Sequence, residues 1–403
     1  MSYSASERRK MRTSEILSVE KRCAQVRPLR VLIVAPSLDI LGGQAVQAAR
    51  LLERLREEPT LEVSFLPVNP RLPGPLRRLQ GVKYLRTVVT SLYYWGLLLA
   101  RVPQYDVIHI FSASYLSFVL APTPAILVAR LYDKRIILNY RSGQAADHLR
   151  RWRRTAIPTI RMADAVAVPS GYLVDVFAQF EIVSRSIPNF VDTDRFSFRE
   201  RSELRPVFLS NRNFEPLYNV ECTLRAFAII QQRWPDAKLI VAGDGSQRGE
   251  LERLAQSLEL RNVEFVGRVA PDQMNALYNA ADVYLNSPDI DNMPGSVIEA
   301  FASGLPVVTT DAGGIPYIVD DRNSGLMVRC GDHRAMAGVA LELLEDRALW
   351  RRITTRAWEE CVRYRWDAVK SEWLKLYHEL VSLRTPMPRR VEVFREAPTG
   401  EFQ

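Results

Sequence analysis

The chain has 403 residues, of which 47% are hydrophobic, so it is long enough to fold as two domains, each with its own core. Its four cysteines, Cys23, Cys222, Cys330 and Cys361, include no Cys-x-x-Cys pair, which argues against a disulfide framework, a zinc site or a redox motif. The net charge of +8 is unevenly divided, because residues 1–204 hold 30 basic and 18 acidic residues and the rest hold 24 and 28. The basic character therefore belongs to the N-terminal half.

No segment predicts secretion or a membrane span. Residues 1–27 are polar and charged and lack the apolar centre of a signal peptide. No stretch of the chain reaches the roughly 18 uninterrupted apolar residues of a transmembrane helix. We therefore expect a soluble cytoplasmic protein with a loose N-terminal tail.

Short apolar runs, separated by helical segments, recur along the chain. In the first half they are 29–37, 61–69, 106–112, 135–141 and 164–170, and in the second half 205–211, 237–245, 263–267, 282–287, 305–311 and 325–329. Near-continuous apolar strands of this kind are typical of parallel sheets that are buried on both faces. The sequence therefore predicts two doubly wound α/β domains.

The apolar rhythm stops at 187–206, where Pro, Asn, Asp and alternating charge predict a linker. The expected divisions are a disordered tail at 1–27, an N-terminal domain at 28–188, a linker at 189–204, a C-terminal domain at 205–365, an amphipathic helix at 366–384 and a second disordered tail at 385–403. A cleft between the two domains is the expected ligand site.

A glycine turn follows the first predicted strand. Gly42 and Gly43 come directly before a helix that is expected to begin near Gln44. Such a turn lets backbone amides and the start of a helix approach a phosphate or a sugar closely. Taken alone, the turn is equally compatible with a tight structural connection.

The segment 286–319 carries the strongest functional signal. It predicts a strand, a loop rich in Asp and Pro, and a helix starting near Gly295 with Glu299 in its second turn. The amides of residues 294–297 are suited to hold a diphosphate, and Glu299 can then accept hydrogen bonds from ribose hydroxyls. Asp291 can reach the transferred sugar. The structural alternative is that Glu299 satisfies backbone amides and that Asp291 caps a turn.

This segment resembles the donor-binding signature of the retaining GT-B glycosyltransferases of family four, in which seven residues separate two carboxylates. Asp291 and Glu299 have this spacing, with Asp where the family usually has Glu. Further stretches similar to the same family, in the same order, are 42–44, 187–196, 239–246 and 263–285. The resemblance runs from about Arg30 to about Tyr377.

The resemblance implies an α/β fold of the GT-B type, with two Rossmann-like doubly wound parallel-sheet domains facing a central cleft. It also implies that the C-terminal helix crosses back to the N-terminal domain. The implied reaction transfers a sugar from a nucleotide diphosphate sugar donor to a sugar or lipid-linked acceptor, with retention of configuration, in polysaccharide or glycolipid synthesis. It needs no metal and no cofactor.

Several roles follow residue by residue from the resemblance. Arg212 stands where the family places an arginine that pairs with the donor diphosphate, a task suited to a permanently charged, chelating guanidinium. Where the family usually has a lysine, this chain has Tyr218, so one expected cation is missing. The nucleobase is expected at Gly267, Arg268 and Val269. The other residues expected to contact substrates are Gly42, Gly43, Gln44, Asn292, Met293, Pro294 and Gly295.

Arg141 occupies the place of a family histidine close to the reacting sugar. Arginine is no base near neutral pH, but it can stabilise a departing phosphate. His148, seven residues further on, is a candidate functional substitute, with a surface or capping role as the alternative. His109, on a predicted strand, is expected to be structural or to line the cleft.

The segment 71–101 contains six basic residues and no acidic ones, interleaved with Leu, Tyr and Trp95. This composition suits peripheral contact with an anionic membrane on its inner face, and the basic cluster at 150–154 adds to it. An amphipathic helix that packs on the sheet and turns a basic face outward is the alternative.

Three other functions compete with an active transferase. A nucleotide-sugar-binding scaffold that has lost catalysis is suggested by the atypical Asp291, Tyr218 and Arg141. A nucleic-acid surface on the basic half is weaker, because no recognised nucleic-acid module appears, and we expect no nucleic-acid partner. Related nucleotide-sugar epimerases fit the carboxylate pattern less well than transferases do.

Overall fold

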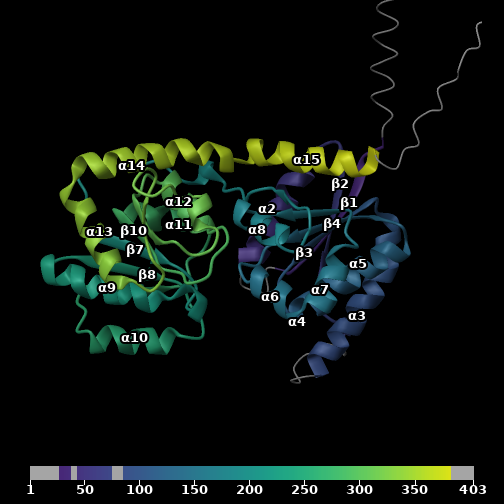
Figure 1. Cartoon of the computed structure of the whole chain (residues 1–403), viewed down its shortest axis with the longest axis horizontal. Helices are drawn as coiled ribbons and strands as arrows, with labels where there is room; N and C mark the ends of the chain where they lie inside the picture. Colours follow the sequence, from purple (N-terminus) through teal and green to yellow (C-terminus); the bar gives the residue numbers. More distant parts are fainter. Residues whose placement is uncertain (1–26, 38–42, 75–84, 383–403) are drawn as a thin grey trace, which may run out of the picture.

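In a computed structural model of the chain, residues 27–37, 43–74 and 85–382 are described. They form two α/β units side by side, each built around a parallel sheet of six strands (Figure 1). Apart from Arg27, the predicted N-terminal tail lies outside the described residues, as does the predicted C-terminal tail at 385–403.

The N-terminal sheet has the strand order β2-β1-β3-β4-β5-β6. Its strands are β1 (Leu29–Ala35), β2 (Leu61–Pro67), β3 (Val107–Ser112), β4 (Arg135–Tyr140), β5 (Ala165–Val168) and β6 (Arg185–Ser186). Its helices are α2 (Gly43–Arg56), α3 (Leu85–Arg101), α4 (Leu116–Leu120), α5 (Pro122–Leu131), α6 (Ala145–Arg151), α7 (Arg153–Ile160) and α8 (Gly171–Ala178). The strand order reverses direction between β1 and β3, which is where doubly wound folds bind ligands.

The C-terminal sheet has the strand order β12-β11-β10-β7-β8-β9, so its reversal lies between β7 and β10. Its strands are β7 (Val207–Asn211), β8 (Lys238–Ala242), β9 (Val263–Gly267), β10 (Val283–Asn286), β11 (Val307–Thr310) and β12 (Leu326–Val328). The helices that follow are α9 (Val220–Arg233), α10 (Arg248–Ser257), α11 (Met274–Ala280), α12 (Gly295–Ala302), α13 (His333–Glu345), α14 (Arg347–Glu360) and α15 (Trp366–Ser382). The predicted architecture of two doubly wound parallel sheets is confirmed.

All eleven predicted apolar runs form strands. Inner strands such as β3 and β10 are buried throughout, as expected for a sheet covered on both faces, whereas the edge strands β2 and β9 are only partly buried. The strand that the sequence did not predict is β6, which has only two residues, Arg185 and Ser186, and no apolar run. It pairs with β5 at the edge of the N-terminal sheet.

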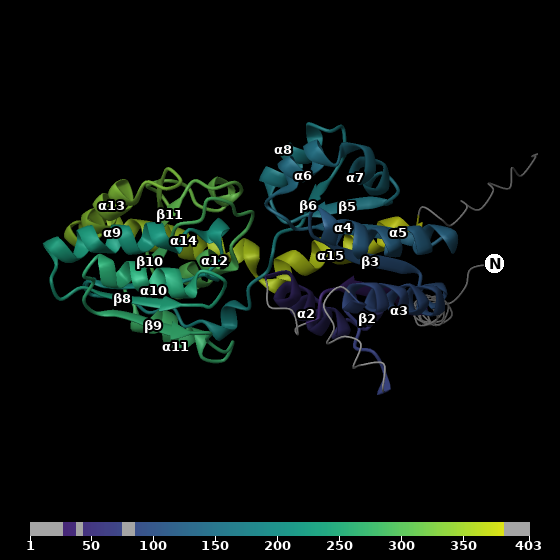
Figure 2. The same ribbon diagram turned by 90° about the horizontal axis from the view of Figure 1, so that it is seen from below.

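The last two helices join the two units. Figures 1 and 2 show α14 beside the C-terminal sheet and α15 crossing to the N-terminal unit. Trp373 and Tyr377 of α15 are buried in the same cluster as Val31 and Ile33 of β1. The predicted return of the C-terminal helix to the N-terminal domain is therefore confirmed.

The segment 187–206 is anchored to the C-terminal unit through one buried carboxylate. Asp282 is fully buried and pairs with Arg199, with Arg201 at 2.9 Å and with Arg205 at 2.6 Å. Burial by itself raises the pKa of Asp282, but hydrogen bonds from Arg205 and Arg201 outweigh this effect and lower the pKa. The chain consequently enters β7 in a defined position.

Residues 85–101 of the predicted basic segment form α3, which packs on the sheet through Tyr94 and Leu98. Residues 75–84 of that segment, with Arg77, Arg78 and Lys83, lie outside the described residues, so the predicted basic face stays a prediction. The outer face of α3 itself exposes a row of apolar side chains, namely Leu85, Val88, Leu92, Trp95 and Leu99. Among the described helices, none is long and apolar enough to cross a bilayer.

Candidate active site

A cleft of about 480 Å³ lies where the two units face each other. The N-terminal unit contributes the start of α2, including Gly43 and Gln44, and the residues that directly follow β4. The C-terminal unit contributes the residues that follow β7 and the loop between β10 and α12. Both contributions come from the carboxyl ends of strands. Of these strands, β1, β7 and β10 lie at the two reversal points, where ligands bind in folds of this kind.

The start of α12 faces this cleft. Pro294 is the residue before the helix, and it provides no side-chain hydrogen bond to the first turn. Gly295 and Ser296 line the cleft, so the positive end of the helix dipole and its first amides point to the place expected for a phosphate. A side chain in place of Gly295 would extend to within 4.0 Å of Gln47 on the opposite unit.

Arg212, directly after β7, lies beside the start of α12. Its guanidinium forms an ion pair with Asp291 and donates a hydrogen bond to Ser296 Oγ at 3.1 Å. Asp291 also accepts a hydrogen bond from the backbone amide of Asn292 at 2.7 Å. Burial by itself lowers the pKa of Arg212, but the charge of Asp291 outweighs it and raises the pKa, so the guanidinium stays charged.

Tyr218 stands in the cleft where the sequence comparison with the family leads one to expect a lysine. Its ring lies 4.2 Å from the guanidinium carbon of Arg212, which is a cation–π contact. Burial raises the pKa of Tyr218, so its hydroxyl remains neutral near pH 7. The tyrosine therefore orients Arg212 and adds no second positive charge.

Glu299 is buried in the wall of the cleft, with 8% of its surface exposed. Its Oε1 is 3.3 Å from Arg50 of α2, and its Oε2 accepts a hydrogen bond from the Tyr278 hydroxyl at 3.0 Å. Burial raises the pKa of Glu299, although Arg50 opposes this effect. The alternative was that Glu299 accepts hydrogen bonds from backbone amides. In the structure, both of its carboxylate oxygens contact side chains instead.

Arg141, directly after β4, lines the opposite wall. Its Nη1 donates to Asn139 Oδ1 at 3.3 Å, and its guanidinium lies 5.3 Å from the centre of the Phe111 ring. Among the described residues, none forms an ion pair with it. Burial lowers the pKa of Arg141 to about 9, so it remains a cation at neutral pH.

The structure does not bring His148 to the cleft. This histidine is fully buried, and its Nδ1 is 2.8 Å from the hydroxyl of Tyr140. Burial lowers its pKa to about 4, so the ring is neutral. Helix α6 turns His148 toward the core, beside Phe118 and Tyr115. His148 is therefore neither a substitute for Arg141 in the cleft nor a surface or capping residue.

The predicted nucleobase contacts also lie apart from the residues that line the cleft. Gly267 ends β9 with φ of 72°, in the left-handed region that favours glycine, and its carbonyl accepts a hydrogen bond from Gly243. Arg268 is 3.2 Å from Asp244. The placement of a nucleobase at Gly267, Arg268 and Val269 stays a prediction. Gly42 lies outside the described residues.

Three contacts between the units were missing from the sequence-based prediction. Arg50 meets Glu299, the Ser170 hydroxyl donates to Asn292 Oδ1, and the Asn189 side chain donates to the carbonyl of Met293 at 3.1 Å. Of these contacts, only that of Arg50 had a signal in the sequence. Arg50 lies two helical turns after Gly43, on a helix already predicted to border the cleft. The contact of Arg50 holds α12 itself, and the other two hold the loop before α12, against the N-terminal unit.

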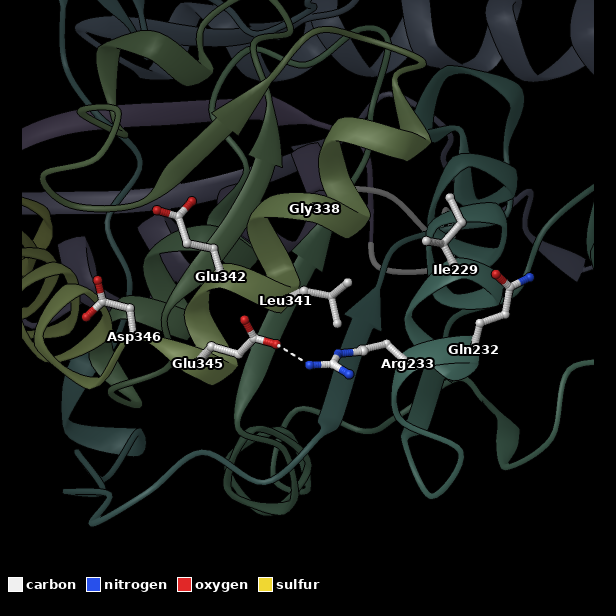
Figure 3. Close-up of a pocket in the computed structure, with 8 residues that line it drawn as sticks. All are labelled: Ile229, Gln232, Arg233, Gly338, Leu341, Glu342, Glu345 and Asp346. Carbon is white, nitrogen blue, oxygen red and sulfur yellow. Dashed lines mark ion pairs between the residues drawn. The ribbon is translucent and has the colours of Figure 1, made fainter.

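A second hollow, of about 720 Å³, lies on the outer face of the C-terminal unit between α9 and α13 (Figure 3). Its side chains belong to the solvent-facing turns of these helices, and Arg233 and Glu345 form an exposed ion pair of 3.6 Å across it. The helix start that it reaches, that of α14, is already capped by the side chain of Asp346, which accepts a hydrogen bond from the Leu349 amide. The cleft between the units, where the start of α12 has no side-chain cap, is therefore the candidate active site.

Two family models match consecutive parts of the chain. The model described as Glycosyltransferase Family 4 matches residues 41–195, and the model described as Glycosyl transferases group 1 matches residues 192–360. The boundary between the two matches falls in the segment that connects the two sheets. Together they include the cleft residues of both units.

Individual relatives agree with these matches. A phosphatidyl-myo-inositol mannosyltransferase of Mycolicibacterium smegmatis is 27% identical over 387 residues, covering 87% of this chain and 93% of the relative. The sulfoquinovosyl transferase of Arabidopsis thaliana is 29% identical over 226 residues, covering 53% of this chain but only 44% of the plant enzyme. The chain therefore matches less than half of the length of that relative.

Among solved structures, a protein of Anabaena in complex with UDP-glucose is similar in fold, with a TM-score of 0.68 at 18% identity. The match covers 87% of this chain and 100% of the Anabaena chain. The two consecutive family matches, the relatives and the two facing sheets lead to one assignment. The chain belongs to the group 1 glycosyltransferases of family four, which have the GT-B fold.

Proposed function

We propose that this glycosyltransferase transfers a hexose, with retention of configuration, from a nucleotide diphosphate sugar to an acceptor hydroxyl in the synthesis of a glycolipid or polysaccharide. The observation that carries the proposal is the position of Arg212 beside the uncapped start of α12 in the cleft. A guanidinium and a helix start are both suited to a diphosphate. The Anabaena neighbour, which was crystallised with UDP-glucose, supports this class of donor.

On the donor wall, Arg212 and the first amides of α12 stabilise the negative charge that grows on the departing diphosphate. The diphosphate takes the place of Asp291 beside Arg212, which frees the Asp291 carboxylate to accept hydrogen bonds from the transferred sugar. Glu299 accepts hydrogen bonds from the ribose hydroxyls. These three roles use contacts that already converge on one end of the cleft.

On the opposite wall, Arg141 contributes a second positive charge toward the reacting group. It lines the same cleft, and Gly143, in the loop that follows it, lies close enough that a side chain there would come within 3.3 Å of the Asp291 backbone. A guanidinium that has no carboxylate partner among the described residues is free to attract a phosphate or a developing oxyanion. Closure of the two units around the substrates excludes water, which otherwise hydrolyses the donor.

The acceptor side of the cleft supports an acceptor with an apolar part. A pocket of about 300 Å³ adjoins the cleft and shares Gly43 and Gln44 with it. Most of its other lining is apolar, including Val68, Phe111 and Pro122. A lipid-linked acceptor fits this lining better than a free sugar does, since a sugar would leave its hydroxyls without partners there. The name of the mycobacterial relative, a phosphatidyl-myo-inositol mannosyltransferase, points to the same acceptor class.

The exposed apolar row of α3 supports peripheral contact with an anionic membrane on its cytoplasmic face. Its members, Leu85, Val88, Leu92, Trp95 and Leu99, follow one another at intervals of three and four residues, so they share one helix face. Apolar side chains on such a face enter the interface of a bilayer, while neighbouring basic residues attract anionic headgroups.

A thermal-shift screen against UDP, GDP and ADP sugars tests the donor site, because a ligand that binds only the folded state raises the melting temperature. We expect one nucleotide class to give a shift, and the Arg212→Ala and Glu299→Ala variants to lose it. Arg225→Ala is the matched control, since Arg225 pairs with Glu221 on the surface of α9. An unchanged shift in Arg212→Ala would show that the donor site lies elsewhere.

Donor consumption separates a transferase from a catalytically impaired scaffold. The enzyme is expected to release the nucleoside diphosphate, and NMR of the product should show the anomeric configuration of the donor. A protein that binds the donor without slow hydrolysis or transfer would be a scaffold. Arg141, Tyr218 and Asp291, whose types suggested a loss of catalysis, all line the cleft, which supports the active enzyme.

Co-sedimentation with vesicles tests the membrane contact. We expect binding to vesicles that contain anionic lipid, weaker binding to zwitterionic vesicles, and loss of binding in the Val88→Ser/Leu92→Ser double variant. Val183→Ser is the control, because Val183 is 93% exposed on a different part of the unit. Binding that is indifferent to anionic lipid would remove the membrane contact from the proposal.

A further inference from the structure

Three buried groups connect Arg141 in the cleft to the C-terminal helix. Asn139 accepts a hydrogen bond from Arg141 Nη1 at 3.3 Å through its Oδ1, and its Nδ2 is 3.0 Å from His109 Nε2. His109 Nδ1 is in turn 2.7 Å from the hydroxyl of Tyr377 on α15. Asn139, His109 and Tyr377 are all buried, so these bonds do not compete with bulk water.

The direction of every bond in this chain follows from the arginine. A guanidinium can only donate, so the carbonyl oxygen of the Asn139 side chain must face Arg141. The amide nitrogen, which can only donate, must therefore face His109, and His109 Nε2 must accept. The single proton of a neutral imidazole then sits on Nδ1 and is donated to the Tyr377 oxygen. Burial, with a smaller effect of Arg141, lowers the pKa of His109 to about 3, which agrees with a neutral ring.

Aromatic packing holds the same groups in place. The Phe111 ring stacks on the His109 ring at 5.2 Å and also contacts the Arg141 guanidinium at 5.3 Å. Trp373 of α15 also packs on His109, at 4.7 Å between the ring centres. Two residues of α15 therefore contact the imidazole, although this helix comes from the far end of the chain and connects to the C-terminal unit.

We propose that Tyr377 and His109, acting through Asn139, are positioning residues that hold the Arg141 guanidinium in its catalytic orientation, so that docking of α15 on the N-terminal unit sets the cation of the acceptor wall. This inference rests on the proposed function for the role of Arg141, but the direction of the hydrogen bonds does not. The relay explains why a fully buried histidine and a buried asparagine lie behind a cleft arginine. It also gives α15 a role beyond joining the two units.

The hydrogen-bond direction is tested by NMR of the full chain labelled with ¹⁵N-histidine, with His109→Gln used to assign the signal among the four histidines. We expect His109 to carry its proton on Nδ1. In Arg141→Ala, the Asn139 amide is free to turn over, and we expect a signal for the Nε2-protonated form to appear. A wild-type His109 with its proton on Nε2 would overturn the relay, whether or not the protein transfers sugar.

The positioning role is tested by a double-mutant cycle in the transfer assay. Asn139→Leu and Tyr377→Phe are expected to lower kcat about tenfold or more, with the donor KM unchanged, since misplacing a catalytic group can cost up to about a hundredfold. In the Arg141→Ala background, the same substitutions should have no further effect. Equal losses in both backgrounds would mean that these residues only support the fold.

Tyr140→Phe is the matched control for Tyr377→Phe. Tyr140 is also a buried tyrosine whose hydroxyl is hydrogen-bonded to a buried histidine, His148. Neither Tyr140 nor His148 lines the cleft, so Tyr140→Phe removes an equivalent hydrogen bond outside the active site. We expect its kcat to equal that of the wild type. If both tyrosine variants lose activity equally, the effect of Tyr377 comes from stability and the proposed relay is wrong, even where the proposed function stands.

Discussion

The two walls of the cleft hold their charged groups in different ways. On the C-terminal wall, Arg212 is paired with Asp291, and Glu299 with Arg50. On the N-terminal wall, Arg141 is held by an amide oxygen and an aromatic ring, and no described residue neutralises it. A ligand must therefore displace a carboxylate to reach Arg212, whereas it can approach Arg141 directly.

This difference suggests a division of tasks between binding and catalysis. The ion pair with Asp291 keeps the buried Arg212 charged and oriented. An incoming diphosphate must take over the interaction that Asp291 makes with Arg212. The positive charge of Arg141 is held only by neutral groups among the described residues, so no carboxylate there offsets it. Arg141 therefore stabilises the transition state, in which negative charge develops nearby, more than it stabilises the bound donor. The donor wall then chiefly determines affinity and the acceptor wall chiefly determines rate.

Removal of Arg141 should give the largest effect on the chemical step. We expect Arg141→Ala to lower kcat by about 100- to 1,000-fold, the usual loss when one group that stabilises the transition state is removed. The dissociation constant of the donor, measured by titration calorimetry, should stay nearly unchanged. Arg141→Lys is the control that keeps the charge but loses the planar fork, and it should recover part of the rate. A large loss of donor affinity in Arg141→Ala would contradict the division of tasks.

Asp291→Asn sharpens the same comparison from the donor side. It leaves Arg212 without its carboxylate, so the ligand-free protein should lose about 3 kcal/mol of unfolding free energy. The nucleoside diphosphate no longer competes with Asp291, and we expect it to bind about tenfold more tightly and to give a larger thermal shift. Denaturant unfolding with and without the nucleotide measures both effects. Weaker nucleotide binding in this variant would show that Asp291 supports the phosphate site and does not compete for it.

Chelation of divalent ions should have the smallest effect. The sequence Asp289-Ile290-Asp291 places two carboxylates near the cleft, but Asp289 accepts hydrogen bonds from Asn219 and Asp291 pairs with Arg212. We therefore expect the transfer rate to be the same with and without a chelator. A strict requirement for a divalent ion would mean that these carboxylates leave their present partners, and the model of the donor wall would have to change.

Much of the site could be predicted because its residues belong to local patterns. Arg212 directly follows a strand, and Glu299 lies in the second turn of a helix that starts at the end of an Asp- and Pro-rich loop. Residues at the carboxyl ends of parallel strands gather at one edge, so a pattern along the chain translates into a place in the fold. The roles of Arg212 and Arg141 came from the resemblance to the family, and Arg141 likewise directly follows a strand, β4.

His148 shows where such reasoning stops. The spacing of His148 from Arg141 gave no information on which side of α6 would face the core, and packing against Phe118 decided it. Similarly, Arg50 could be placed on α2 but not opposite Glu299, since that contact depends on how closely the two units approach.

The amino-acid sequence by itself determined the two parallel sheets, the donor-side loop and the chemical types that line the cleft, because strand burial and helix starts depend on neighbours along the chain. Only the tertiary structure decided that Asp291 pairs with Arg212 and that Tyr377 meets His109, from which it is separated by 268 positions. Such contacts join segments whose patterns carry no information about each other. They form when the two units and the returning helix are packed together, and they depend on distances that no local pattern encodes.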